Sequence, residues 1–118
     1  MSRDSIGIQE RTFKFAIKIF YFCKYIREDK NEFILSEQLL RSGTSIGANV
    51  REAQNAESKM DFIHKLNIAQ KETDETIYWL ELIKETLKID TVELLLEANS
   101  IFKIIKSIII STKKNLKS

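Results

Sequence analysis

His64 and Cys23 are the only histidine and the only cysteine in a chain of 118 residues, so they are the first candidates for metal binding or covalent catalysis. A structural zinc site needs about four ligands, mostly histidine or cysteine, and these two residues cannot supply them. Helical spacing places Cys23 on an apolar face, where a thiol behaves as a small hydrophobe, and His64 on an outer face. The chain has no glycine-rich phosphate loop and no nucleophile elbow. We therefore expect a protein that is not an enzyme and that needs no metal or cofactor.

A stripe of polar residues is the clearest sign of specific contacts in the chain. Residues spaced by three or four positions share one edge of a helix, and the spacing predicts such an edge for Gln38, Arg41, Ser45, Asn49 and Glu52. A second stripe offers carboxylates to Arg41 or Arg51 across an interface and comprises Ile68, Glu72, Glu75 and Trp79. We predict a polar network that sets helix register or subunit orientation. A ligand-binding or catalytic site is the alternative that the same residues leave open.

Basic residues gather at two places, although the formal net charge is only +2. Arg11, Lys14 and Lys18 share one helical edge with Tyr21 and Tyr25. From position 103 onward the chain has no acidic residue and five lysines, namely Lys103, Lys106, Lys113, Lys114 and Lys117. Since the first and last helices of a bundle are neighbours, the two groups are expected to join into one basic side that contacts the phosphates of RNA or DNA. The alternative is that these side chains only form solvated helix faces.

Four helical segments must position these residues. Apolar residues recur with a helical period over positions 8–27, 35–56, 59–87 and 91–111. Proline is absent and glycine occurs three times, which leaves few of the turn residues that a β or α/β fold needs. Because the connections are only a few residues long, consecutive helices must run antiparallel. The sequence therefore predicts a single all-α domain over residues 1–118, an antiparallel up-down-up-down four-helix bundle.

Capping residues refine the predicted helix ends. Ser36 and Asn31 are alternative N-caps for the second helix. The segments 58–61 and 90–93 resemble capping boxes, in which a side chain at the helix start accepts a hydrogen bond from the backbone three residues later. The residues from Thr112 onward are expected to form a frayed basic end.

The predicted helices carry more apolar surface than one bundle can bury. A bundle helix needs a single apolar stripe, yet Phe13, Ile17 and Phe20 lie away from the core-facing stripe of the first helix. Similar second stripes occur on the third and fourth helices, at Ile68, Trp79, Leu82, Ile83, Val92, Leu96 and Ile110. Burying one such side chain is worth about 1.5–3 kcal/mol, so we expect these surfaces to meet identical copies in a homo-oligomer. A splayed bundle with a wide core is the alternative.

The sequence gives no sign of a membrane segment or an export signal. The longest apolar stretch, at 101–110, is about half of a membrane span and is interrupted by Lys103 and Lys106. No apolar secretory segment opens the chain, and a single cysteine fits a reducing compartment. We expect a cytoplasmic protein without membrane contact.

One set of residues resembles a known protein family. The pattern Gln38-x-x-Arg41-Ser42-x-x-Ser45-Ile46-x-x-Asn49-x-x-Glu52-Ala53, followed by Phe62, Leu66, Ala69, Glu72, Glu75 and Trp79-Leu80, resembles the bacterial 23S rRNA intervening-sequence proteins. The resemblance implies an up-down four-helix bundle that assembles into a pentameric ring. More distantly, the chain is similar to the accessory variability proteins of diversity-generating retroelements, which bind a reverse transcriptase and nucleic acid.

Two functions are consistent with these observations. The first is a non-enzymatic homo-oligomeric adaptor, pentameric by resemblance, that binds RNA or DNA through its basic residues. The second is a protein-binding scaffold that docks a partner protein at the region of Ile68 and Trp79, or at the basic edge, without binding nucleic acid.

Overall fold

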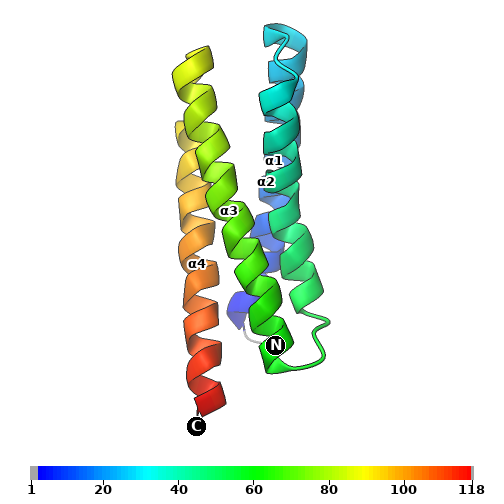
Figure 1. The fold of residues 1–118 in the computed structure, drawn as a ribbon, viewed down its shortest axis with the longest axis vertical. Helices are drawn as coiled ribbons and strands as arrows, with labels where there is room; N and C mark the ends of the chain where they lie inside the picture. The colour runs from blue at the N-terminus through cyan, green and yellow to red at the C-terminus, as the bar shows by residue number, and fades with distance from the viewer. Residues whose placement is uncertain (1–2, 118) are drawn as a thin grey trace.

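The computed structural model of the protein describes residues 3–117. In this range the chain forms four α-helices, α1 (Arg3–Lys30), α2 (Ile34–Ala53), α3 (Lys59–Leu87) and α4 (Val92–Lys117). Each helix packs on the next and α1 packs on α4, whereas within the described residues no two Cα atoms of diagonally opposite helices lie within 8 Å. Figure 1 shows consecutive helices running in opposite directions along a bundle whose longest dimension is 52 Å. The predicted all-α, up-down-up-down four-helix bundle is confirmed.

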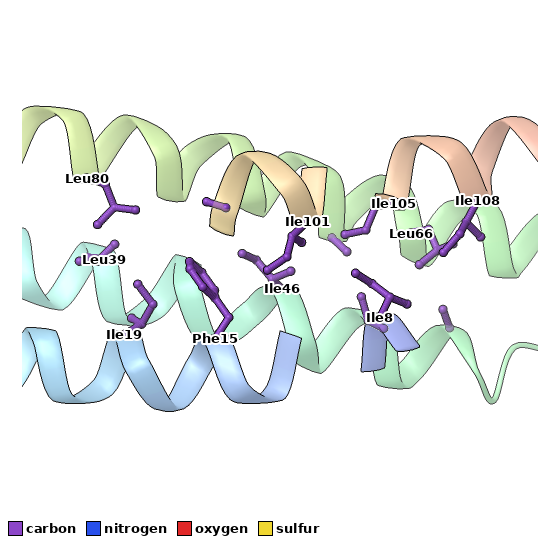
Figure 2. Packing of buried hydrophobic residues seen from close by; sticks show 14 of the residues in the cluster. Ile8, Phe15, Ile19, Leu39, Ile46, Leu66, Leu80, Ile101, Ile105 and Ile108 are labelled. Carbon is purple, nitrogen blue, oxygen red and sulfur yellow. The ribbon is translucent and has the colours of Figure 1, made fainter. Parts of the chain in front are cut away.

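The core lies along the inside of all four helices, on the apolar stripes that the helical period predicts. Figure 2 shows these side chains pointing toward one another between the helices. The largest fully buried side chains come from every helix and include Ile8, Phe15, Ile19, Ile26, Leu39, Ile46, Leu66, Leu80, Ile101 and Ile105.

The second apolar stripes differ in how far they are covered. Val92, Leu96 and Ile110 of α4 are exposed, as the sequence predicts. On α3, Trp79 packs partly buried against the core, and Ile83 is completely buried. The prediction that Ile83 lies on an outer stripe was therefore wrong. Ile83 comes three residues after the buried Leu80, which puts it on the core-facing side of the helix.

Helices α1 and α2 approach each other closely at two glycines of α2. A Cβ atom added at Gly43 would lie 2.8 Å from Cγ2 of Ile19, and one added at Gly47 would lie 3.3 Å from the carbonyl oxygen of Thr12. The glycines four residues apart thus form a flat strip against α1. The small residues of α2 therefore allow α1 of the same chain to pack closely against it.

The start of α2 is capped differently from the sequence prediction. The Glu32 carboxylate accepts hydrogen bonds from the backbone nitrogens of Ile34 at 2.7 Å and Leu35 at 3.0 Å. Neither Ser36 nor Asn31 is the N-cap of α2, because Ser36 is buried and donates to the carbonyl oxygen of Glu32 at 2.8 Å. Asn31 instead has a φ of 55° and directly follows Lys30, where it ends α1.

The start of α3 matches its prediction more closely than the start of α4. Ser58 accepts a hydrogen bond from the backbone nitrogen of Asp61 at 3.0 Å, as expected for a cap. For α4, the Asp90 carboxylate accepts from the backbone nitrogen of Val92 at 2.9 Å, two residues later rather than three. The buried Thr91 hydroxyl donates to the carbonyl oxygen of Leu80, which ties the start of α4 to α3.

Two predicted helices are shorter than the helices in the structure, and one is longer. The α1 helix covers the predicted range 8–27 and continues at both ends, whereas α2 stops at Ala53 rather than at position 56. The expected frayed end after position 111 is wrong, because α4 continues to Lys117. The Thr112 hydroxyl donates to the carbonyl oxygen of Ile108 at 2.8 Å within this last part. Figure 1 shows this end of α4 projecting past the connection between α2 and α3.

Candidate functional site

An arginine-centred polar network joins α2 to α3. The Arg41 guanidinium donates to Glu72 at 3.2 and 3.4 Å and also to Glu75, and the Trp79 indole nitrogen donates to Glu75 at 3.2 Å. Burial alone would raise the pKa of Glu75, but hydrogen bonds from Arg41 and Trp79 and the charge of Arg41 together hold it below 4.5. These residues meet within one chain, so they fix α2 against α3.

The other polar residues of the predicted α2 stripe turn back on their own helix or face solvent. The Ser45 hydroxyl donates to the carbonyl oxygen of Arg41 at 2.6 Å, and the Asn49 amide donates to the carbonyl oxygen of Ser45 at 2.9 Å. Gln38 is half-buried, and Glu52 is exposed. The stripe thus positions one residue, Arg41, for a contact with α3.

A buried hydroxyl pair between α2 and α3 escaped the sequence reasoning. The Thr76 hydroxyl donates to the Ser42 hydroxyl oxygen at 3.0 Å, and both side chains are completely buried. Ser42 lies three residues after the buried Leu39 and four before the buried Ile46, so its position on the core-facing stripe was readable from the sequence. It went unnoticed because a small polar residue carries no hydrophobic signal.

The apolar stripe of α1 is exposed in the single bundle. Phe13, Ile17 and Phe20 retain 54%, 44% and 49% of their accessible surface. Beside Phe13, a groove of about 570 Å³ runs between α1 and α2, and its floor includes Gly47. The Arg51 guanidinium lies 5.7 Å from the centre of the Phe13 ring at the side of this groove. The stripe is apolar, and the groove beside it is lined by apolar residues together with the polar side chains of Arg51 and Glu52.

The three cations of α1 that were predicted to bind phosphate are each paired with a carboxylate. Arg11 contacts Glu97 at 2.7 Å and also donates to Ser100. Lys14 contacts Glu10 at 2.9 Å, and Lys18 contacts Glu93 at 3.6 Å. The hydrogen bond from Lys14 lowers the pKa of Glu10. Because α1 and α4 are antiparallel, Arg11 and Lys18 meet carboxylates in the acidic first half of α4, whereas the carboxylate partner of Lys14 lies on α1 itself. That the two basic groups form one side of the bundle stays a prediction.

The lysines in the second half of α4 have a different environment. Within residues 7–116, no carboxylate oxygen lies within 4.0 Å of the amino nitrogens of the four exposed lysines Lys103, Lys106, Lys113 and Lys114. Lys106 lines a groove toward α3 rather than toward α1. Unlike Arg11, Lys14 and Lys18, these four lysines have no carboxylate partner in the described part of the chain, and no acidic residue follows position 103 in the sequence.

The remaining candidates for chemistry are separated from each other. Cys23 is buried in the core, and this burial raises the pKa of its thiol to about 12 against the weaker effect of the Arg27 charge. His64 is exposed on α3. In the part of the chain that the structure describes, no three side chains of histidine, cysteine, aspartate or glutamate are grouped to hold a metal ion. None of the helices in that part combines the length and hydropathy that a bilayer-crossing segment requires.

The chain is similar to one known protein family and to a solved structure. A family model described as 23S rRNA-intervening sequence protein matches residues 4–109. The chain is also similar to a crystal structure from Bacteroides thetaiotaomicron VPI-5482, described as a protein with unknown function from the S23 ribosomal protein family. The two are 43% identical with a TM-score of 0.87, over 90% of this chain and 97% of that chain. No curated protein sequence matches. In agreement with the resemblance seen in the α2 motif, the chain belongs to the family of 23S rRNA-intervening sequence proteins.

Proposed function

We propose that this protein is a non-enzymatic adaptor whose identical bundles assemble through α1 and bind RNA or DNA through the lysines in the second half of α4. It needs no cofactor in this role. We place it in the cytoplasm, because its buried free cysteine suits a reducing compartment.

The exposed stripe of α1 supports the assembly. Three large apolar side chains about half exposed on one helix are costly to leave in water, and covering the rest of each is worth about 1 kcal/mol. Closed symmetric contacts between identical copies are the usual way to cover such a surface. The pentameric ring implied by the family resemblance is the assembly that we propose.

The observation that carries the nucleic-acid role is the lack of carboxylate partners around Lys103, Lys106, Lys113 and Lys114 within residues 7–116. A lysine already paired with a carboxylate must give up that ion pair before it neutralises a phosphate, whereas these lysines have no such pair to break. Repetition around a ring multiplies the surface, so a few lysines per subunit suffice for binding at low salt.

A salt titration tests the proposal. Fluorescence anisotropy of labelled mixed-sequence RNA and DNA, measured between about 50 and 200 mM salt, is expected to show affinity that falls steeply with salt. The decisive variant replaces the four lysines with glutamine and is expected to lose most of the binding. Its matched control has the same change in net charge and replaces the exposed lysines Lys24, Lys30, Lys59 and Lys84.

The same titration separates this proposal from the protein-scaffold function. If the unmodified protein binds neither nucleic acid at the lowest salt, the adaptor proposal fails, and the apolar surface of α1 and the Trp79 region become candidates for a protein partner. Equal loss of binding in the α4 variant and in its control would show that total charge, rather than α4, determines the affinity.

A further inference from the structure

A second groove on the bundle differs in chemistry from the apolar surface beside α1. It lies between α3 and α4, which pack side by side (Figure 1), and has a volume of about 410 Å³. Its walls combine amide groups, an aromatic ring, two amines and one carboxylate, from Asn67, Gln70, Lys71, Asp74, Phe102 and Lys106. The volume is within the range of small-molecule sites. We call it the α3–α4 groove.

We propose that the α3–α4 groove binds one unpaired nucleotide of a single-stranded nucleic acid, with the base against Phe102 and the flanking phosphates at Lys71 and Lys106. This inference rests on the proposed function, and it adds a site and a preference for single strands. Neither follows from the lysines of α4 alone.

The residue types match the parts of a nucleotide. Phe102 is half-buried between its neighbours, so its ring is held in place while one part stays open to a base. The side-chain amides of Asn67 and Gln70 both donate and accept hydrogen bonds, as the edge of an unpaired base requires. In a duplex the faces of the base are covered by stacking, so this contact needs a single strand.

The charges at the groove favour an anion despite Asp74. Lys71 and Lys106 come from different helices, and within residues 7–116 neither has a carboxylate oxygen within 4.0 Å of its amino nitrogen. Lys113 is seven residues after Lys106 and lies on the same stripe of α4, which extends the positive path beyond the groove. Asp74 opposes an anion, so it is the one lining residue whose neutralisation should improve binding.

The test compares single-stranded and duplex oligonucleotides of mixed sequence, as RNA and as DNA, by fluorescence anisotropy at constant salt. Phe102→Leu keeps an apolar side chain but removes the aromatic face, and we expect single-strand affinity to fall roughly five- to one-hundred-fold with duplex affinity unchanged. Phe33→Leu, at an exposed aromatic residue on the opposite end of the bundle from the α2–α3 connection, is the matched control. Far-UV circular dichroism verifies that each variant is folded.

Charge variants give a second, opposite readout. Asp74→Asn is expected to raise single-strand affinity, while Asp29→Asn, an equal change at an exposed site on α1, leaves it unchanged. A plot of the logarithm of the binding constant against the logarithm of the salt concentration has a slope that reports the number of neutralised phosphates. Replacing Lys71 and Lys106 with glutamine should reduce the magnitude of this slope by about 0.7 for each phosphate that the variant no longer neutralises. RNA and DNA single strands bind equally if the base and phosphates alone are recognised, and a difference between them assigns a role to the ribose hydroxyl.

The outcomes distinguish failure of the groove proposal from failure of the proposed function. If the protein binds nucleic acid but Phe102→Leu and Asp74→Asn leave single-strand affinity unchanged, the groove is not the site, and the adaptor proposal stands. If the unmodified protein binds no oligonucleotide at low salt, the adaptor proposal and the groove fail together.

Discussion

At the scale of single residues, Arg41 shows how one side chain holds two helices in register. It donates to two carboxylates that lie three residues apart on α3, and Trp79 donates to one of them. Arg41 is about half exposed, so water screens the pair and its net contribution to stability is small. The contact therefore acts mainly on helix register, because a shift of α2 along α3 would separate these groups.

The lowered pKa of Glu75 gives this network a pH dependence. A carboxyl whose pKa is lower in the folded protein than in the unfolded chain stabilises the fold above about pH 4.5, and that stabilisation is lost as the pH falls through the folded pKa. We predict that Glu75→Gln costs about 0.5–1 kcal/mol of unfolding free energy at neutral pH. Urea unfolding at a series of pH values should show this cost vanishing below pH 4.5. A cost that stays constant down to strongly acidic pH would contradict the assigned role.

Gly43 lies at a close approach of α1 to α2. Adding a methyl group there gains about 1 kcal/mol in helix propensity but forces a contact at 2.8 Å with Ile19, and overpacking of this kind costs about 1–3 kcal/mol. Gly43→Ala is thus expected to destabilise the protein by about 1 kcal/mol, measured by urea unfolding. Gly7→Ala is the control, because nothing lies within 4 Å of its added methyl group, and it should stabilise the protein. Stabilisation by both substitutions would show that α1 accommodates the methyl group at position 43 without a loss of unfolding free energy.

Individual residues were predictable where helical spacing decides their environment. Spacing alone grouped Arg41 with Glu72 and Glu75, because each lies on the edge of its helix beside the apolar stripe. It could not show that Arg41 would meet these carboxylates in its own chain, since this depends on how far α2 slides along α3. The carboxylate partners of Arg11 and Lys18 were missed for the same reason.

At the scale of helices, the connections are built with few residues suited to tight turns. Residues with positive φ are Asn31 and Lys88, and no described glycine has this conformation. Lys88 follows the last residue of α3 with a φ of 56°, a position at which glycine is usually found. A left-handed conformation costs a residue with a Cβ atom roughly 1–2 kcal/mol, and asparagine tolerates it better than lysine.

Lys88→Gly is therefore expected to stabilise the protein by about 0.5–1 kcal/mol, after allowance for the greater freedom of glycine in the unfolded chain. Thermal unfolding followed by circular dichroism measures the effect. Lys84→Gly changes the same residue type one turn earlier, inside α3, and should lower stability by about 1 kcal/mol. If Lys88→Gly also lowers stability, the left-handed end of α3 is not strained.

Helix existence and type were predictable from periodicity, but helix ends were not. The predicted range of α3 coincides with the helix because Ser58 is a clear cap followed by a long apolar period. The start of α2 was predicted within one residue, but its cap was wrong because the capping group is a glutamate side chain, Glu32, which the usual preferences do not highlight. The length of α4 was underestimated, since its last residues bear no apolar stripe yet still form helix.

At the scale of the whole molecule, the single bundle leaves an apolar stripe on α1 uncovered. We predict that Phe13→Asp or Ile17→Asp dissociates the assembly, because either change would bury a charge in the interface. Both side chains are already about half exposed in the single bundle, so either change should cost the fold itself only about 1 kcal/mol, for the half that is buried. Size-exclusion chromatography with light scattering measures the mass, and Met60→Asp, at an exposed residue of α3, is the control. Retention of the full mass by both α1 variants would place the interface elsewhere.

The sequence could predict that surplus apolar surface exists, because amphipathic patterns reveal stripes directly. It could not distinguish which stripes the bundle covers by itself, and Ile83 shows this, because its exclusion from the core was wrong. The pairing of Arg11 and Lys18 with carboxylates likewise depends on the antiparallel alignment of α1 with the acidic first half of α4.

Sedimentation equilibrium of the purified protein is the most direct test of the central claim, that bundles associate to cover α1 and thereby repeat the lysines of α4. We expect a mass that is a defined multiple of the 13.8 kDa chain, five-fold for the ring that we propose, and unchanged on dilution through the micromolar range. A mass of 13.8 kDa at all concentrations would contradict it, because the stripe of Phe13, Ile17 and Phe20 would then be stable in water without a partner.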